Sequence, residues 1–113
     1  MAAKTGIFPV LLGETFTTSG ATTWGNTTSK QVGVIRIDSA HTVTFDSTNY
    51  PGEPGDAVLC VNTSEGNRTV EITPSPFSDD GNDDITLGDG DTCVMVYHGT
   101  HGWLQLASTG NVA

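Results

Sequence analysis

The feature that most constrains this chain is the alternation of apolar and polar residues in short segments separated by turn-forming residues. Residues 41–46 place Val43 and Phe45 on one face of an extended chain and threonines on the other. Residues 69–73 repeat this period of two, which is typical of a β-strand with one face in a core. No segment has the 3.6-residue apolar period of an amphipathic helix, so the sequence predicts an all-β protein.

Other segments are predicted to be strands because they are rich in Val, Ile, Thr and aromatic residues and end in Gly, Pro, Asn or Asp. The run at residues 57–62 is almost entirely apolar, which predicts burial of both its faces. Frequent turns predict a compact β-sandwich or a jelly-roll-like barrel, and their spacing is too irregular for a repeat solenoid. The predicted strands are residues 14–18, 32–37, 41–46, 57–62, 69–73, 84–87, 92–98 and 103–107.

The start of the chain differs from the rest. Residues 1–12 are predicted to be an extended N-terminal arm, and residues 13–113 a single β-sandwich domain. Pro9 excludes a central-strand role for the apolar patch in the arm. The patch is also too short for a signal peptide or a membrane span, so we expect synthesis in a cytoplasm. Cys60 and Cys93 then fit buried, reduced thiols, although a disulfide between them stays open.

Charge restricts the partners of the chain. The sequence has 13 Asp plus Glu against 4 Lys plus Arg, which gives a net charge of −9. Binding of nucleic acid needs several bases that face phosphates, and an anionic membrane repels an acidic chain. We therefore expect neither nucleic acid nor a membrane as a partner.

Two groups of residues have the chemistry of metal ligands. The acidic region at residues 79–91 has the Asp and Gly content of a calcium loop, but it lacks the bidentate Glu of an EF-hand and stacked repeats. A solvated loop is the preferred interpretation, with calcium binding left open. His98 and His101 lie across a predicted turn, where they can meet, and His41 is the third histidine. Because a site needs three or four converging ligands, we expect no metal site and no cofactor.

Catalytic motifs are absent from the sequence: there is no nucleophile elbow, phosphate-binding loop or zinc-protease motif. Paired carboxylates occur only in a Gly- and Asp-rich loop, which cannot supply the fixed, desolvated setting of a general acid. The chain is therefore predicted not to be an enzyme. The rings of Trp24, Tyr50, Tyr97 and Trp103 could form a sugar-stacking platform, but packing in a core or a subunit interface is preferred.

The second half of the chain has a distinctive order of motifs. Gly55-Asp56 precedes a strand that ends in Asn62, a second strand runs into Pro74, a Leu-x-x-Gly-Asp turn covers residues 87–91, and Gly102-Trp103 opens the last strand. This order resembles that of the small β modules of tailed-bacteriophage virion proteins, among them the capsid decoration (cement) proteins. The resemblance extends over about half of the chain.

The resemblance implies a structural virion protein that binds the outer surface of a phage capsid and stabilises it by bridging neighbouring subunits of the major capsid protein. It also implies a homo-oligomer, with a trimer favoured over a dimer, that is made in the bacterial cytoplasm. The arm is suited to strand addition at a partner's sheet edge. The alternative is a carbohydrate- or receptor-binding module of a head or tail fibre, which needs exposed, coplanar rings. The expected capsid contacts are Ile7, Phe8, Val10, Leu11, Leu12 and Trp24.

Overall fold

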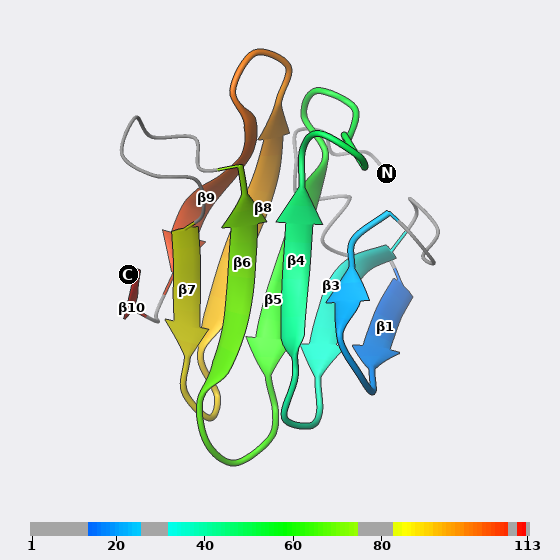
Figure 1. Cartoon of the computed structure of the whole chain (residues 1–113). Coiled ribbons are helices and arrows are strands. Elements are labelled where there is room, and N and C mark those ends of the chain that lie inside the picture. Colours follow the sequence, from blue (N-terminus) through cyan, green and yellow to red (C-terminus); the bar gives the residue numbers. More distant parts are fainter. Residues whose placement is uncertain (1–13, 26–31, 75–82, 109–110, 113) are drawn as a thin grey trace, which may run out of the picture.

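A computed structural model describes residues 14–25, 32–74, 83–108 and 111–112 of the chain, which form two five-stranded sheets (Figure 1). The described residues contain no helix, and so none that could cross a bilayer. The all-β prediction is confirmed, in the form of a β-sandwich. In spatial order, sheet A consists of β1 (Glu14–Thr18), β3 (Val32–Ile37), β5 (Ala57–Asn62), β8 (Thr92–His98) and β9 (Gly102–Ser108). Sheet B consists of β10 (Asn111–Val112), β7 (Asp83–Leu87), β6 (Arg68–Thr73), β4 (Thr42–Asp46) and β2 (Thr22–Thr23).

The first six strands cross alternately between the sheets. Within sheet A, β1, β3 and β5 are parallel neighbours, and β2, β4 and β6 are parallel neighbours in sheet B. The chain returns to a sheet only after it has formed a strand in the other sheet. Neighbouring strands of one sheet therefore run in the same direction. The strands from β7 onward pair antiparallel with their neighbours. The parallel pairs distinguish this sandwich from a jelly roll, whose strands are antiparallel.

Inward side chains of both sheets form one core. Val43 and Phe45 are fully buried, as the alternation of their strand predicts. Burial of each large aliphatic or aromatic side chain stabilises the fold by roughly 1.5–3 kcal/mol. Sheet A contributes Ile35, Ile37, Val58, Cys60, Cys93, Met95 and Trp103, and sheet B contributes Val43, Phe45, Val70, Ile72, Ile85 and Leu87.

The two cysteines lie opposite one another inside the sandwich. Cys60 of β5 is the register partner of Cys93 of β8, and both are buried and free. A hydrogen bond with the Cys93 thiol raises the pKa of Cys60 well above its usual value, and burial raises it further. The thiolate is therefore suppressed, and with it the reactivity of this thiol.

Turns gather at the two ends of the sandwich. The β3–β4, β5–β6 and β7–β8 connections all lie at the lower end in Figure 1, and the β8–β9 turn lies at the upper end. Gly102 opens β9 with a φ of 80°, and a Cβ there would collide with the hydroxyl of Ser47. That hydroxyl accepts a hydrogen bond from the backbone N–H of Trp103 at 2.8 Å. Only glycine fits this position, because the backbone approaches Ser47 so closely.

Candidate functional site

A buried amide holds two loops together at the lower end of the sandwich. The Asn62 side chain is fully buried, and its Nδ2 donates to the carbonyl oxygens of Gly66 at 2.8 Å and Leu87 at 2.9 Å. Its Oδ1 accepts from the backbone N–H and the hydroxyl of Ser64, at 2.9 and 2.8 Å. All four hydrogen-bonding positions of the amide are used, so Asn62 is a structural residue of the end of β5.

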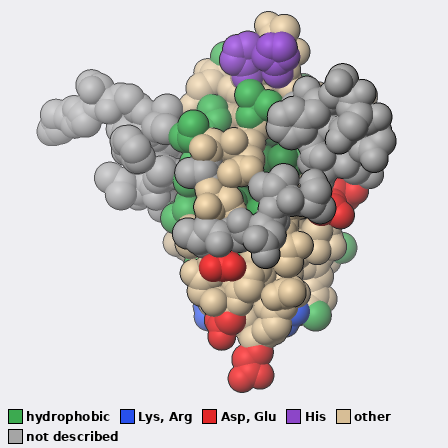
Figure 2. All heavy atoms as spheres, turned by 90° about the vertical axis from the view of Figure 1, so that its left-hand side faces the viewer, with side chains coloured by type: hydrophobic (Ala, Val, Ile, Leu, Met, Phe, Trp, Pro, Cys, Tyr) green, Lys and Arg blue, Asp and Glu red, His purple; other side chains and the backbone are tan. Residues whose placement is uncertain are grey.

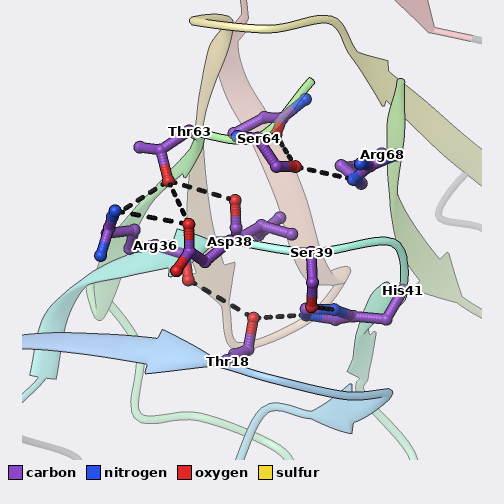
Figure 3. A network of polar contacts seen from close by, with 10 residues as sticks. Thr18, Arg36, Asp38, Ser39, His41, Thr63, Ser64 and Arg68 are labelled. Atoms are coloured by element: carbon purple, nitrogen blue, oxygen red, sulfur yellow. Dashed lines mark hydrogen bonds and ion pairs between the residues drawn. The ribbon is translucent and has the colours of Figure 1, made fainter. Parts of the chain in front are cut away.

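Two arginines belong to the polar network beside this amide (Figure 3). The Nε of Arg36 donates to the Thr63 hydroxyl at 3.0 Å, and its guanidinium lies 3.4 Å from a carboxylate oxygen of Asp38. The Nε of Arg68 donates to the Ser64 hydroxyl at 2.8 Å. Each guanidinium is thus bound to a loop of its own chain, an arrangement that fixes the turns.

His41 lies in the same network, between a turn and the edge strand β1 (Figure 3). Its Nε2 is 2.5 Å from the hydroxyl of Thr18, and its Nδ1 is 3.1 Å from the hydroxyl of Ser39. Burial lowers the pKa of His41, and the positive charge of Arg68 lowers it further. Thr18 is only 1% exposed, so no substrate reaches its hydroxyl. The hydrogen bonds among Thr18, Ser39 and His41 hold β1 against the β3–β4 turn, and the buried Thr18 hydroxyl is not presented as a nucleophile.

The other two histidines form the tip of the β8–β9 turn (Figure 2). The rings of His98 and His101 stack with centroids 4.9 Å apart, so the prediction that they can meet is confirmed. Nδ1 of His98 accepts the backbone N–H groups of Thr100 and His101 at 3.1 and 3.2 Å. That nitrogen is occupied by the turn, which leaves it unavailable to a metal ion.

The acidic region is only partly described, since residues 79–82 lie outside the described ranges. Asp84 faces outward from sheet B opposite Glu71, and Asp91 accepts the backbone N–H of Gly88 at 2.9 Å. Asp89 is exposed in the turn between them. Over the ranges that the structure covers, no three His, Cys, Asp or Glu side chains converge as metal ligands.

The aromatic residues pack together inside the sandwich. Trp24 is 5% exposed and stacks on Phe45 at 6.2 Å, and Phe45 meets the fully buried Trp103 edge to face at 5.1 Å. Tyr97 also meets Trp103 edge to face, with ring centroids 5.2 Å apart. Both tryptophans are thus core residues, and the Trp24 ring is inaccessible to a capsid or a sugar in this structure. The other expected contacts, Ile7, Phe8, Val10, Leu11 and Leu12, lie outside the described residues.

The outer face of sheet A is aliphatic across the middle of β3, β5, β8 and β9. Leu59 and Val61 point outward from the central strand β5 and are half-buried. The predicted burial of both faces of this strand is therefore confirmed for the inner face and only partly for the outer face. Strand pairing places Leu59 between Val34 and Val94 in one row. We call this surface the aliphatic face, and it consists of Val34, Leu59, Val61, Val94, Val96 and Leu104. Leu106, which is 58% exposed, follows on β9 at a β-bulge.

The outer face of sheet B is polar. Thr42, Thr69 and Thr86 form a row across β4, β6 and β7. In the next row the Thr44 hydroxyl donates to a carboxylate oxygen of Glu71 at 3.3 Å. We call this surface the threonine face, and it consists of Thr42, Thr44, Thr69, Glu71, Thr73, Asp84 and Thr86. The threonine face consists of polar side chains that favour contact with water. The aliphatic face is therefore the candidate functional site.

Comparisons of this chain with protein-family models, with curated proteins and with solved structures give no match.

Proposed function

We propose that this chain is a structural, non-enzymatic virion protein that binds the outer surface of a phage capsid and stabilises it by bridging neighbouring subunits of the major capsid protein. The aliphatic face supports the proposal because it offers a surface for a protein partner, either the shell or a second copy of the chain. The largest contiguous apolar patch on a soluble monomer measures about 300–600 Å² and is often a functional surface for a protein or a membrane. The net charge of −9 opposes an anionic membrane, which leaves protein as the favoured partner.

The shape and composition of the aliphatic face favour protein over a small ligand. Small molecules bind in concave pockets that enclose most of their surface. The aliphatic face is instead one side of a sheet, whose rows of Val and Leu suit packing against another flat, apolar surface. The buried rings of Trp24 and Trp103 support the same choice, because a sugar platform needs them in the open.

The mechanism that follows is mechanical. A bound module adds contacts between neighbouring capsomers, so their separation must also break those contacts. Several weak contacts made by one molecule gain from effective concentration and hold more firmly than any one of them. In this proposal the apolar arm residues anchor the module to the shell, and the threonine face with Glu71 and Asp84 is turned to the solvent.

The test is binding of the purified full chain to expanded phage capsids, measured by sedimentation and band densitometry. A capsid repeats the same junction between capsomers many times, so the proposal expects saturation at hundreds of copies per particle. It also expects a raised thermal stability of the capsid. The full-length double variant Leu11→Asp, Leu12→Asp is expected to lose binding while keeping its melting temperature. Thr69→Lys on the threonine face serves as a control and is expected to bind like the wild type. Absence of binding, or a few copies at one vertex, contradicts the proposal.

A further inference from the structure

We propose that the aliphatic face is the contact between two copies of this chain, which meet sheet A to sheet A in a two-fold dimer. The inference deepens the proposed function, on which it rests, by naming the partner that covers this face. Contact with the shell then belongs to other parts of the chain, and each dimer presents those parts twice. A face that is complementary to itself pairs copies in twos, which favours a dimer over the trimer that the sequence resemblance implies.

The distribution of carboxylates favours a second copy as the occupant. With a net charge of −9, two copies repel one another in most orientations. The threonine face places Glu71 next to Asp84. In contrast, none of the outward side chains that the structure describes in the strands of sheet A is a carboxylate. Contact through sheet A lets two acidic molecules meet while the carboxylates of sheet B remain on the far sides.

The rim of the aliphatic face carries a self-complementary pair of charges. Arg36 lies on β3 beside Val61, and Asp38 follows β3 directly. Their side chains are 3.4 Å apart and 44% and 45% exposed. In a two-fold contact, every pair of residues that meets across the interface occurs a second time with the two copies exchanged. Arg36 of each copy can therefore face Asp38 of the other. Such rim charges contribute little affinity, but they select the orientation in which two sheets meet.

The dimensions of the aliphatic face predict a weak dimer. Strands about 4.8 Å apart, each with about six residues of about 3.3 Å, give four strands a flat area of roughly 400 Å². A stable interface buries about 800 Å² per partner. The free protein should therefore dimerise weakly and reversibly, so the dimer fraction should rise with protein concentration. On a capsid the high local concentration of bound copies would complete the association.

The experiment is sedimentation velocity of the full chain over a series of protein concentrations, with two variants of the aliphatic face and one control. Val61→Lys places a charge within the aliphatic face, beside Arg36, and the double variant Leu59→Thr, Val61→Thr makes the surface resemble the threonine face. Thr69→Lys adds the same charge to sheet B. We expect the wild type and Thr69→Lys to dimerise alike, and both aliphatic-face variants to raise the dissociation constant by about tenfold or more. Unchanged melting temperatures establish that the variants are folded.

A wild type that stays monomeric at every concentration overturns the inference, and so does a dimer that the aliphatic-face variants leave intact. The capsid assay separates this failure from failure of the proposed function. If the wild type is monomeric and Val61→Lys loses capsid binding, the shell covers the aliphatic face, so the inference fails while the proposed function stands. If the dimer behaves as expected but no copies bind capsids, the proposed function fails and the self-contact remains.

Discussion

The aliphatic face and the threonine face lie over the same core, yet their chemistry is opposite. In β6 the outward positions hold Thr69 and Glu71, whereas in β5 they hold Leu59 and Val61. A sandwich needs only the inner face of each sheet to be apolar. The aliphatic face of sheet A is therefore not required by the fold, and the proposed partner would account for its composition.

Strand propensity does not explain the difference between the faces. Val and Thr have almost the same shape, and both are β-branched residues that favour strands. Val61 on one face and Thr69 on the other therefore serve the backbone equally well. What distinguishes them is the free energy of contact with water, so Val on sheet A and Thr on sheet B agree with the proposal that a partner covers the aliphatic face.

The largest expected effect tests whether both faces depend on one core. Trp103 is fully buried against Phe45 of the opposite sheet, so Trp103→Ala should lower the free energy of unfolding by about 3–5 kcal/mol. Urea denaturation measures the loss. The remaining tryptophan, Trp24, packs beside sheet B, and its fluorescence should change together with the far-ultraviolet circular dichroism of all the strands. Two separate transitions would show that the faces rest on independent units.

If Trp103→Ala does not fold, Trp103→Phe gives the same information at lower cost. A phenyl ring keeps the packing against Phe45 but loses the hydrogen bond from the indole Nε1 to the Tyr50 carbonyl at 3.4 Å. We expect a smaller loss than for Ala, with a single transition again.

The second effect concerns the tie between the sheets at the lower end. Asn62 of sheet A donates to the Leu87 carbonyl of sheet B, and Asn62→Ala leaves several buried polar groups without their partner. The free energy of unfolding should fall by about 2–4 kcal/mol in a urea titration. Asn67→Ala, an exposed position in the same loop, is the matched control and should change stability by less than about 0.5 kcal/mol. Equal losses in both variants would contradict the role of the buried amide.

The sequence predicts the strands better than their order. Alternation locates β4 and β6 because every second residue is buried, and the strand predicted at residues 14–18 is confirmed as β1. The two-residue strands β2 and β10 were not predicted, since a pair of residues has no period. Parallel pairing of alternate strands was also missed, because alternation specifies which face a residue occupies and not which strand lies beside it.

The motifs behind the family resemblance are all structural where the structure describes them. Asn62 joins two loops, Gly102 approaches the Ser47 hydroxyl, and Trp103 fills the core. They specify the sandwich, and a function carried by surface residues leaves no trace in such a pattern. The almost entirely apolar run at residues 57–62 is a signal for the aliphatic face, but a strand covered on both sides by its own fold has the same run.

A smaller effect depends on pH at the crossing from sheet A to sheet B. The pKa of His41 is lowered by burial and by Arg68, so folded His41 resists a proton that the unfolded chain accepts near pH 6.5. Stability is therefore complete above that pH and declines as the pH falls through 6.5 toward the lowered pKa of the folded state. Thermal unfolding between neutral pH and pH 5 should show this decline, and His41→Gln should flatten it.

Asp46 provides an internal comparison for that measurement. Burial acts to raise the pKa of Asp46, but hydrogen bonds from the Asn49 side chain and from the backbone of Asn49 and Thr48 outweigh it and lower the pKa. The stability from these bonds is present above about pH 3.9 and is lost below it. A decline near pH 6.5 that persists in His41→Gln would assign the effect to another group.

The smallest change in stability is expected for a double variant that makes the threonine face resemble the aliphatic face. In the double variant Thr69→Val, Thr86→Val, the row beside Thr42 becomes aliphatic with almost no change in shape, so the free energy of unfolding should move by less than about 0.5 kcal/mol. Association should change far more, because a molecule with two self-complementary faces can join neighbours on both sides and form open assemblies. Sedimentation velocity would then detect species larger than a dimer.

If the variant behaves like the wild type, the flanking charges of Glu71 and Asp84 keep the sheet B faces of two molecules apart. Neutralising these charges with Glu71→Gln and Asp84→Asn should then allow the larger assemblies to form. If that also changes nothing, side-chain polarity is not what separates the two faces.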